Sequence, residues 1–327
     1  MQISPRFIKR FLALISFIAI TWVVYRLWNL ENWNSFGDYL SNHRLEAFRL
    51  MGIQLVLLFI NLRLESRRWQ LLIAPISNIS IWKSFYQVLK GIQMGMITPA
   101  RAGDPIGKSV FFKTTERWRV VLLSFAGSII QNVIILVAAV AALFATGINN
   151  HPLKEKFVNY YSETDSYWTW GVVATVLIIV FLLMRHHLWS GNISEKFKSH
   201  VLVFKEHRIS NLVRITMLTA LRFLVFSFQF YLLLRFFGLN DIRNGFLSVF
   251  IYYGALSFLP STGAGDLGLR ASLALIIFGQ TELAGPAIVM SSLLLWFFNL
   301  GIPAVLPSLS SIPSVFKQKI QKRTLPV

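Results

Sequence analysis

Two short stretches of the chain, 97–108 and 258–270, combine the same residue types in the same order. Each has a Pro, a Gly-Asp pair a few residues later, a further Gly and then a cation. Pro and Gly break helices, and ionised side chains are costly in lipid, so such residues inside an apolar chain indicate function. The two stretches together predict a shared polar site within a membrane.

The first stretch carries the side chains Arg101, Asp104 and Lys108. If a helix resumes after Pro105, Asp104 stands at its N-terminus as a cap, and Lys108 lies about one turn further on. Together with helix N–H groups, the Arg101 guanidinium could hold a phosphate-bearing headgroup through two parallel hydrogen bonds. The alternative is a capped helix whose cations only anchor the chain at the cytoplasmic surface.

The second stretch carries Asp266 and Arg270, which are four residues apart and therefore face one another on a helix. We expect Arg270 to bind a headgroup phosphate from the outer side, and Asp266 to neutralise Arg270 when the site is empty. The alternative is a structural ion pair at the start of a helix after Gly265.

The Pro and Gly residues of both stretches are predicted to be structural hinges around these charges, because they allow bends that a continuous helix does not. These residues are Pro99, Gly103, Gly107, Pro260, Gly265 and Gly268.

A further candidate for headgroup binding is Arg222, which lies inside an apolar run. Gln229 follows seven residues later, on the same helix face, and Gln131 and Asn132 lie inside an earlier apolar run. These polar groups could line a route for the headgroup, or they could be ordinary hydrogen-bonding groups between helices.

Glu65, Arg67 and Arg68 follow another apolar run, and we expect them to form a cluster at the membrane surface, with Arg68 reaching lipid phosphates. His186 and His187 are adjacent and would point about 100° apart on a helix, so they predict no metal site. The chain has no Cys, P-loop, nucleophile elbow or zinc spacing. Neither a cofactor nor soluble-type catalysis is predicted.

The composition is typical of an integral membrane protein. Of 327 residues, 55% are hydrophobic and 14% are charged, whereas soluble proteins carry about 25% charged residues. The net charge of +18 could by itself suggest nucleic acid, but most cations lie between apolar runs, where cytoplasmic loops collect them. The expected partners are therefore membrane lipids with anionic headgroups, and not nucleic acid.

The elements that must position the polar residues are apolar runs long enough to cross about 30 Å of hydrocarbon as helices. The predicted fold is all-α, a polytopic membrane bundle with six full spans: 11–30, 47–64, 119–147, 168–186, 213–237 and 285–307. Two interrupted segments, 82–99 and 245–281, are predicted to be re-entrant hairpins. If both arms of each hairpin cross instead, the number of spans is eight or more.

The charges of the loops predict the orientation. Cations precede the first run and follow the last, so both termini are expected to be cytoplasmic, in the plasma (inner) membrane of a bacterium. We interpret 1–327 as a single transmembrane domain with a cytoplasmic tail, 308–327. The order span, hairpin, span occurs at 47–147 and again, inverted, at 213–307, as in alternating-access carriers.

The motif from Pro99 to Asp104, the Gly-rich segment from Pro260 to Arg270 and the pair Arg68-Trp69 resemble the lysylphosphatidylglycerol synthase transmembrane-region family of bacterial membrane proteins. The resemblance extends over residues 10–310. In the best-understood members this module resembles a lipid flippase, fused to a soluble aminoacyl-transferase domain. Because this chain ends at Val327, directly after the last predicted span, the resemblance implies flippase-like behaviour without synthase activity.

Two places depart from the family's pattern. Ala271 stands where the late motif usually has Glu, and Gln131 and Asn132 stand where a Glu or Arg and an Asp are common. Fewer carboxylates are therefore expected in the site, and Asp266 could replace the missing one. The departures leave the substrate and any ion coupling open.

The leading hypothesis is a lipid transporter of the flippase type, which accepts an anionic phospholipid or isoprenoid-linked headgroup while the acyl chains stay in the bilayer. A second hypothesis is an enzyme, or the membrane subunit of one, that modifies a lipid headgroup with Asp104 as general base. A third is a scaffold that recruits a synthase. A second copy of the chain or a separate lipid-modifying enzyme would then be a partner.

Overall fold

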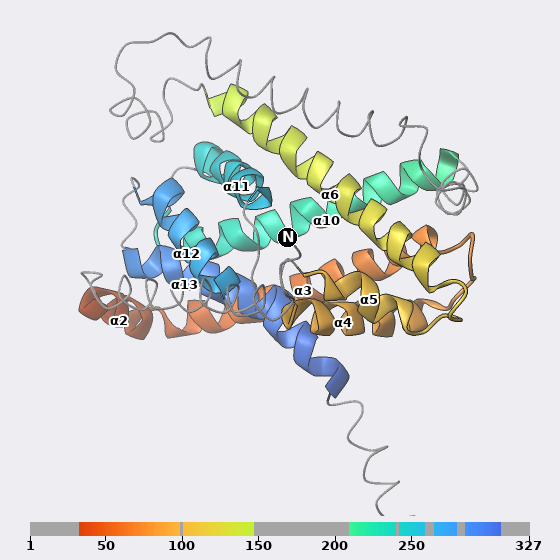
Figure 1. Ribbon diagram of the computed structural model, residues 1–327. Coiled ribbons are helices and arrows are strands. Elements are labelled where there is room, and N and C mark those ends of the chain that lie inside the picture. The colour runs from red at the N-terminus through yellow and green to blue at the C-terminus, as the bar shows by residue number, and fades with distance from the viewer. Residues whose placement is uncertain are drawn as a thin grey trace, which may run out of the picture.

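The computed structural model describes residues 33–98, 101–146, 209–239, 242–258, 265–279 and 285–308, and this part of the chain is helical without β-strands. Figure 1 shows the arrangement. The helices are α2 (Trp33–Asn42), α3 (Arg44–Leu72), α4 (Ile81–Met96), α5 (Gly103–Ser109), α6 (Arg117–Thr146), α10 (Ile209–Phe236), α11 (Ile242–Ser257), α12 (Gly265–Phe278) and α13 (Gly285–Trp296), which continues into the π-helix η3 (Phe297–Gly301). The predicted all-α class is confirmed for these residues.

Four of these elements are long and apolar enough to cross a membrane: α3, α6, α10 and the helix Gly285–Ser308. They coincide with four of the six predicted spans and are compatible with an integral membrane protein. The other two, 11–30 and 168–186, lie outside the described residues. The helix α3 continues to Leu72, two turns beyond the predicted end at 64.

The outward faces of the long helices are apolar. Phe48 and Phe59 on α3, Val137 on α6 and Met217 on α10 each expose more than half of their surface. Such faces are unfavourable in water and match the hydrocarbon of a bilayer. Several polar residues of these helices, among them Gln54, Glu65 and Gln229, are buried inside the bundle instead.

The two interrupted segments each form helix, break, helix. The helices α4 and α5 lie against each other, as do α11 and α12. Pro99 and Pro260 fall in the breaks between them and lie outside the described residues. Re-entry of these pairs from one membrane face, and the inverted relation between 47–147 and 213–307, stay predictions.

Glycine allows α4 and α5 to approach closely. A Cβ atom at Gly107 would lie 2.8 Å from the Lys90 carbonyl oxygen, and one at Gly103 would collide with the Met94 carbonyl. A Cβ at Gly91 would collide with the carboxylate of Asp104. Small residues four apart on both helices are a common means of close helix packing in membranes.

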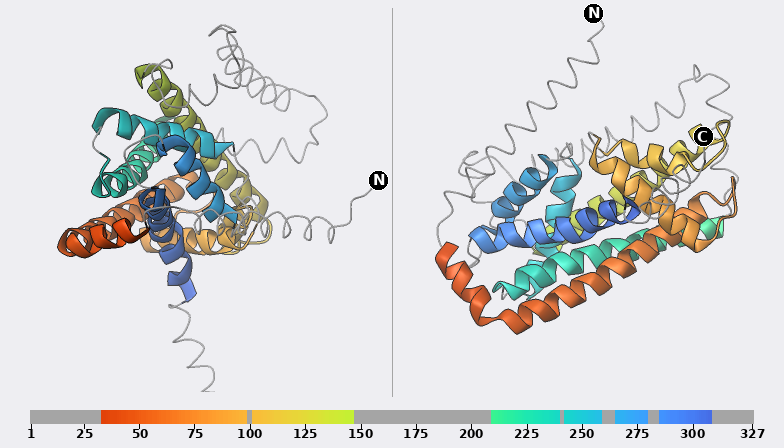
Figure 2. Two further views of the ribbon diagram at one scale, coloured as in Figure 1. Left: turned by 90° about the vertical axis from the view of Figure 1, so that its left-hand side faces the viewer. Right: turned by 90° about the horizontal axis from the view of Figure 1, so that it is seen from below.

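The helices α3 and α10 run antiparallel and side by side, as Figure 2 shows in its right-hand view. The Gln54 amide nitrogen donates to the Gln229 carbonyl oxygen at 3.0 Å, and the Gln229 amide nitrogen donates to the Gln54 carbonyl at 3.3 Å. This reciprocal pair links the two helices where no water can serve as partner. Gln229 therefore has the interhelical role that the sequence left as one alternative.

Two apolar cores lie along this helix pair. One gathers the aromatic residues of α10, α11 and α12, including Phe230, Tyr252 and Phe278. The other joins the C-terminal half of α3 to α4, with Trp69 and Leu72 among its members. Along α6 and α10, the polar side chains described next lie between residues of the first core and residues of the second.

Candidate functional site

A buried carboxylate, Glu65 on α3, is the centre of the candidate site. Only 5% of its surface is exposed, and three cations approach it from three helices. Its Oε2 lies 2.8 Å from Arg68 Nη2 and 3.1 Å from Arg222 Nη1, and its Oε1 lies 3.4 Å from Lys108 Nζ. The name Glu65 cluster is used below for Glu65, Arg68, Arg101, Asp104, Lys108, Gln131 and Arg222.

The prediction that Glu65 and Arg68 are exposed, with Arg68 reaching lipid phosphates, does not fit the structure. Both are buried, because α3 continues to Leu72 and carries them inside the helix bundle. Arg67 points away from the bundle and donates to Gln70. Within one turn of α3, Glu65 and Arg68 therefore face the bundle while Arg67 faces outward.

Lys108 links α5 to the cluster. It is 4% exposed, and its Nζ lies 2.8 Å from Asp104 Oδ1 and 5.1 Å from the centre of the Trp69 ring. An ammonium above an indole face is favoured by the ring's quadrupole. Lys108 therefore joins two carboxylates, Asp104 and Glu65, through one buried charge.

The prediction that Asp104 caps a helix was also wrong. The helix α5 begins at Gly103, with Ala102 at the N-cap position and no side-chain cap bond from it. The Gly103 N–H instead donates to Thr98 Oγ1 at 2.7 Å. Because the hydroxyl of Thr98 takes this donor, the Asp104 carboxylate is left for Lys108.

Two amides complete the hydrogen bonding of the cluster. Gln131 on α6 accepts from Arg222 Nη1 at 2.6 Å and from Arg68 Nη1 at 3.3 Å. Asn61 on α3 accepts from Arg222 Nε at 2.9 Å and donates to Asn299 in the π-helix at 2.6 Å. Gln131 thus contributes to the site, and the polar network reaches the last described helix.

Arg101 is the least constrained cation of the group. Among the non-glycine residues that the structure describes, it alone has a positive φ, 55°. Such a conformation is uncommon outside glycine and is often found at functional sites. Its side chain and that of Asp104 lie over Gly95, and in the described part of the chain its guanidinium forms no ion pair.

The charges of the Glu65 cluster do not balance. Four cations meet two carboxylates: Arg68, Arg101, Lys108 and Arg222 against Glu65 and Asp104. Excess charge away from water is unfavourable unless an opposite charge accompanies it. The arrangement therefore suits an anion with several acceptor oxygens, such as a phosphate group.

The second predicted stretch forms a separate and simpler group. Arg270 Nε donates to Asp266 Oδ2 at 2.8 Å within α12, which confirms the predicted pairing, and Asp266 is 4% exposed. The Tyr252 hydroxyl donates to the Arg270 carbonyl oxygen at 3.4 Å. Among the described residues, no ion pair or hydrogen bond joins this pair to the Glu65 cluster.

The structure thus brings together Arg101, Asp104, Lys108 and Arg222 and leaves Asp266 and Arg270 apart. The remaining predicted residues have other positions. Asn132 is exposed. Gly268 and Ala271 are buried within α12, and Gly265 begins that helix. Gly103 and Gly107 form the contact between α4 and α5.

Sequence reasoning missed Glu65, Arg68, Asn61 and Asn299 as site residues. A signal existed, because the polar residues at 54, 61, 65 and 68 recur at spacings of seven, four and three and so share one helix face. That face is apparent only if the helix is extended past residue 64.

Within the described ranges, no group of three or more His, Asp or Glu side chains could hold a metal ion. His186 and His187 lie outside these ranges.

The chain finds no match among protein-family models or among curated proteins. The resemblance drawn from the two motifs therefore stays a prediction.

Proposed function

We propose that this chain is a membrane carrier that binds the anionic headgroup of a lipid in the Glu65 cluster and moves it between leaflets while the acyl chains stay in the bilayer. The proposal includes a bacterial inner membrane and two cytoplasmic termini, as the loop charges predict. The substrate class is a phospholipid or an isoprenoid-linked phosphate.

One observation carries the proposal. Three buried or partly buried cations share two carboxylates, with a fourth cation, Arg101, beside them, between helices that are apolar on their outer faces. Ionised groups at such a depth are expensive, and they usually mark a substrate or ion pathway. The positive excess selects an anion over a cation.

The cluster supplies a reason for reversible binding. The side chain of Asp104 is 24% exposed, whereas those of Glu65 and Lys108 are 7% and 5% exposed. An incoming phosphate would compete with Asp104 for Lys108 and would also meet Arg101, which has no ion pair in the described part of the chain. When the headgroup leaves, Asp104 returns to Lys108, which then again has both Asp104 and Glu65 as counter-ions.

Reconstitution tests the proposal. Purified protein in liposomes should increase the rate at which fluorescent phospholipids and an isoprenyl phosphate change leaflet, relative to empty liposomes. Arg222→Gln should remove most of this increase, because it deletes the bonds to Glu65, Gln131 and Asn61.

The matched control is Arg235→Gln, the same change near the end of α10, where the residue is exposed and, among the described residues, its guanidinium donates to the Tyr231 hydroxyl alone. The proposal would be rejected if folded wild-type protein moved none of the tested lipids. Equal rates in the two variants would reject the Glu65 cluster as its site. A modified lipid detected by mass spectrometry in the same liposomes would favour the enzyme hypothesis instead.

A further inference from the structure

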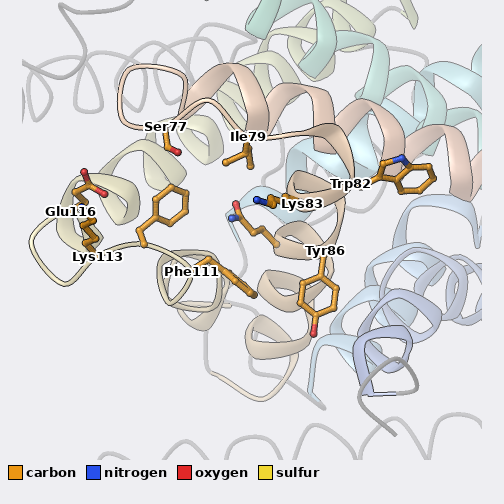
Figure 3. A pocket seen from close by; sticks show the side chains of 10 residues that line it. Ser77, Ile79, Trp82, Lys83, Tyr86, Phe111, Lys113 and Glu116 are labelled. Atoms are coloured by element: carbon orange, nitrogen blue, oxygen red, sulfur yellow. The ribbon is translucent and has the colours of Figure 1, made fainter. Parts of the chain in front are cut away.

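A pocket outside the Glu65 cluster lies where two connections meet, the one from α3 to α4 and the one from α5 to α6. Its volume is about 700 Å³, which is within the size range of small-molecule sites. Figure 3 shows Lys113 and Glu116 on one side of it, Trp82 and Tyr86 on the other, and Phe111 between them. The lining residues are Ser77, Ile79, Trp82, Lys83, Tyr86, Gln87, Phe111, Phe112, Lys113 and Glu116.

One lining side chain, Gln87, offers amide donors to the pocket. Gln87 is 5% exposed, and its Oε1 accepts from Trp69 Nε1 at 2.8 Å. Its amide nitrogen forms no hydrogen bond within the part of the chain that the structure describes. This nitrogen is not among the buried polar atoms that lack a partner, so it remains accessible, and its two donors at the pocket suit a ligand with acceptor oxygens.

The other lining groups specify that ligand further. Lys83 and Lys113 bring two ammonium groups against the single carboxylate of Glu116. Trp82 exposes 73% of its surface and Phe111 exposes 43%, so a broad aromatic surface adjoins the cations. Aromatic residues with lysines beside them are typical of the boundary between headgroups and hydrocarbon.

We propose that this pocket is a second binding site, which takes the phosphate group of an amphiphile at the membrane surface while the apolar part lies along Trp82 and Phe111. Interfacial anchoring alone would explain exposed lysines and aromatic residues. It does not account for a pocket whose lining also offers the amide donors of Gln87.

The pocket is separate from the Glu65 cluster, yet adjacent to it. Trp69, 1% exposed, divides the two: its Nε1 donates to Gln87, and Lys108 lies over its ring. The binding of an amphiphile here does not require transport. If the proposed carrier function holds, a headgroup binds in this pocket before it enters the Glu65 cluster.

Calorimetric titration of the purified full chain in detergent tests the site with three probes: dihexanoyl phosphatidic acid, inorganic phosphate and dihexanoylglycerol. The first should bind, inorganic phosphate should bind at least about tenfold more weakly, and the neutral lipid should not bind. Binding of dihexanoylglycerol as tight as that of the phosphatidic acid would overturn the phosphate assignment. Inorganic phosphate binding as tightly as the lipid would overturn the amphiphile assignment.

Gln87→Glu is the most informative variant. It retains an acceptor for Trp69 but replaces the amide donors with negative charge, so affinity for the phosphatidic acid should fall at least about tenfold. Gln93→Glu makes the same change on the same helix, outside the pocket, and should leave affinity unchanged. Unchanged affinity in Gln87→Glu would overturn the site.

Two further variants keep the result independent of folding and of transport. Lys83→Gln with Lys113→Gln alters only exposed positions and should also weaken binding, by about threefold or more. Arg222→Gln removes the contribution of the Glu65 cluster to the titration, and in this background Gln87→Glu should still weaken the binding that remains. If Arg222→Gln abolishes binding while Gln87→Glu does not, the probe occupies the Glu65 cluster and the pocket proposal fails, whatever the outcome for transport.

Discussion

The Glu65 cluster and the Asp266–Arg270 pair are both buried groups of charges in an apolar bundle, but they are built differently. Glu65 receives cations from α3, α5 and α10, and the amide of Gln131 comes from α6. The Asp266–Arg270 pair lies four residues apart within α12 and needs no other helix for its ion pair.

Because of this difference, the Glu65 cluster can respond to a ligand, whereas the Asp266–Arg270 pair cannot readily do so. The pair on α12 is balanced, one acid for one base, and its geometry is fixed by the helix that carries it. The Glu65 cluster has more cations than carboxylates, and its distances depend on how several helices are placed. An anion that enters the cluster changes its energy and so can favour one placement of α5 relative to α3 and α10.

Among the variants that test how the Glu65 cluster differs from the Asp266–Arg270 pair, Glu65→Gln should have the largest effect on stability. Removing this carboxylate leaves three buried cations facing one another, and we expect the free energy of unfolding to fall by about 3–5 kcal/mol. Unfolding in mixed SDS micelles measures the change. Glu46→Gln, an exposed acid in the first turn of the same helix, is the control and should shift it by less than about 0.5 kcal/mol. A small effect of Glu65→Gln would mean that the cluster is not held by its central acid.

Much of the helical framework was predictable, because long apolar runs flanked by cations have few alternatives in a membrane. Four predicted spans coincide with described helices for this reason. The end of α3 was not predictable from hydropathy, since Glu65, Arg67 and Arg68 lower it as a loop would. Tertiary contacts with Lys108, Arg222 and Gln131 make the buried charges of Glu65 and Arg68 tolerable inside a helix, whereas Arg67 faces outward.

The site was predictable only where the geometry is local. Spacing along one helix gave the pairing of Asp266 with Arg270, and an i, i+4 relation likewise joins Asp104 to Lys108. The convergence of Arg222 and Glu65 depends on how α10 lies against α3, and hydrophobic periodicity carries no information about that register.

The second prediction concerns the close approach that brings α5 to the cluster. Gly91→Ala places a Cβ against the Asp104 carboxylate and 2.8 Å from Lys108 Cε, so we expect a loss of about 1–3 kcal/mol in the free energy of unfolding. Gly52→Ala on α3 is the matched control. A Cβ there has nothing within 4 Å, so this change should stabilise by about 0.5–1 kcal/mol. Losses of equal size at both positions would show that α4 and α5 do not meet as described.

The third prediction examines the balanced pair. Asp266→Asn leaves the Arg270 guanidinium without a counter-ion, and because that side chain is partly exposed we expect a loss of only about 1–2 kcal/mol. Combining it with Arg270→Gln should recover most of this loss, since neither charge then remains. Unfolding free energies of the three variants give the coupling between the two residues. If the double variant were less stable than the single one, Arg270 would have partners beyond Asp266.

The smallest expected change in stability is at Asn299, at the end of the polar network where the Glu65 cluster reaches the last described helix. Among the described residues, the Asp266–Arg270 pair makes no such connection to another helix through its ion pair. Asn299 stands in the π-helix Phe297–Gly301, and its Oδ1 accepts from Asn61, which in turn accepts from Arg222. Asn299→Ala removes one hydrogen bond between helices, so the free energy of unfolding should fall by about 0.6 kcal/mol and by no more than about 1.7 kcal/mol. Ser291→Ala on α13 is the control. That hydroxyl bonds to Ala287 in its own helix, and its loss should matter less. If lipid transport slows in Asn299→Ala but not in Ser291→Ala, the position of Arg222 depends on the last helix, and the cluster extends over five elements of the bundle. Equal transport rates would confine it to α3, α5, α6 and α10.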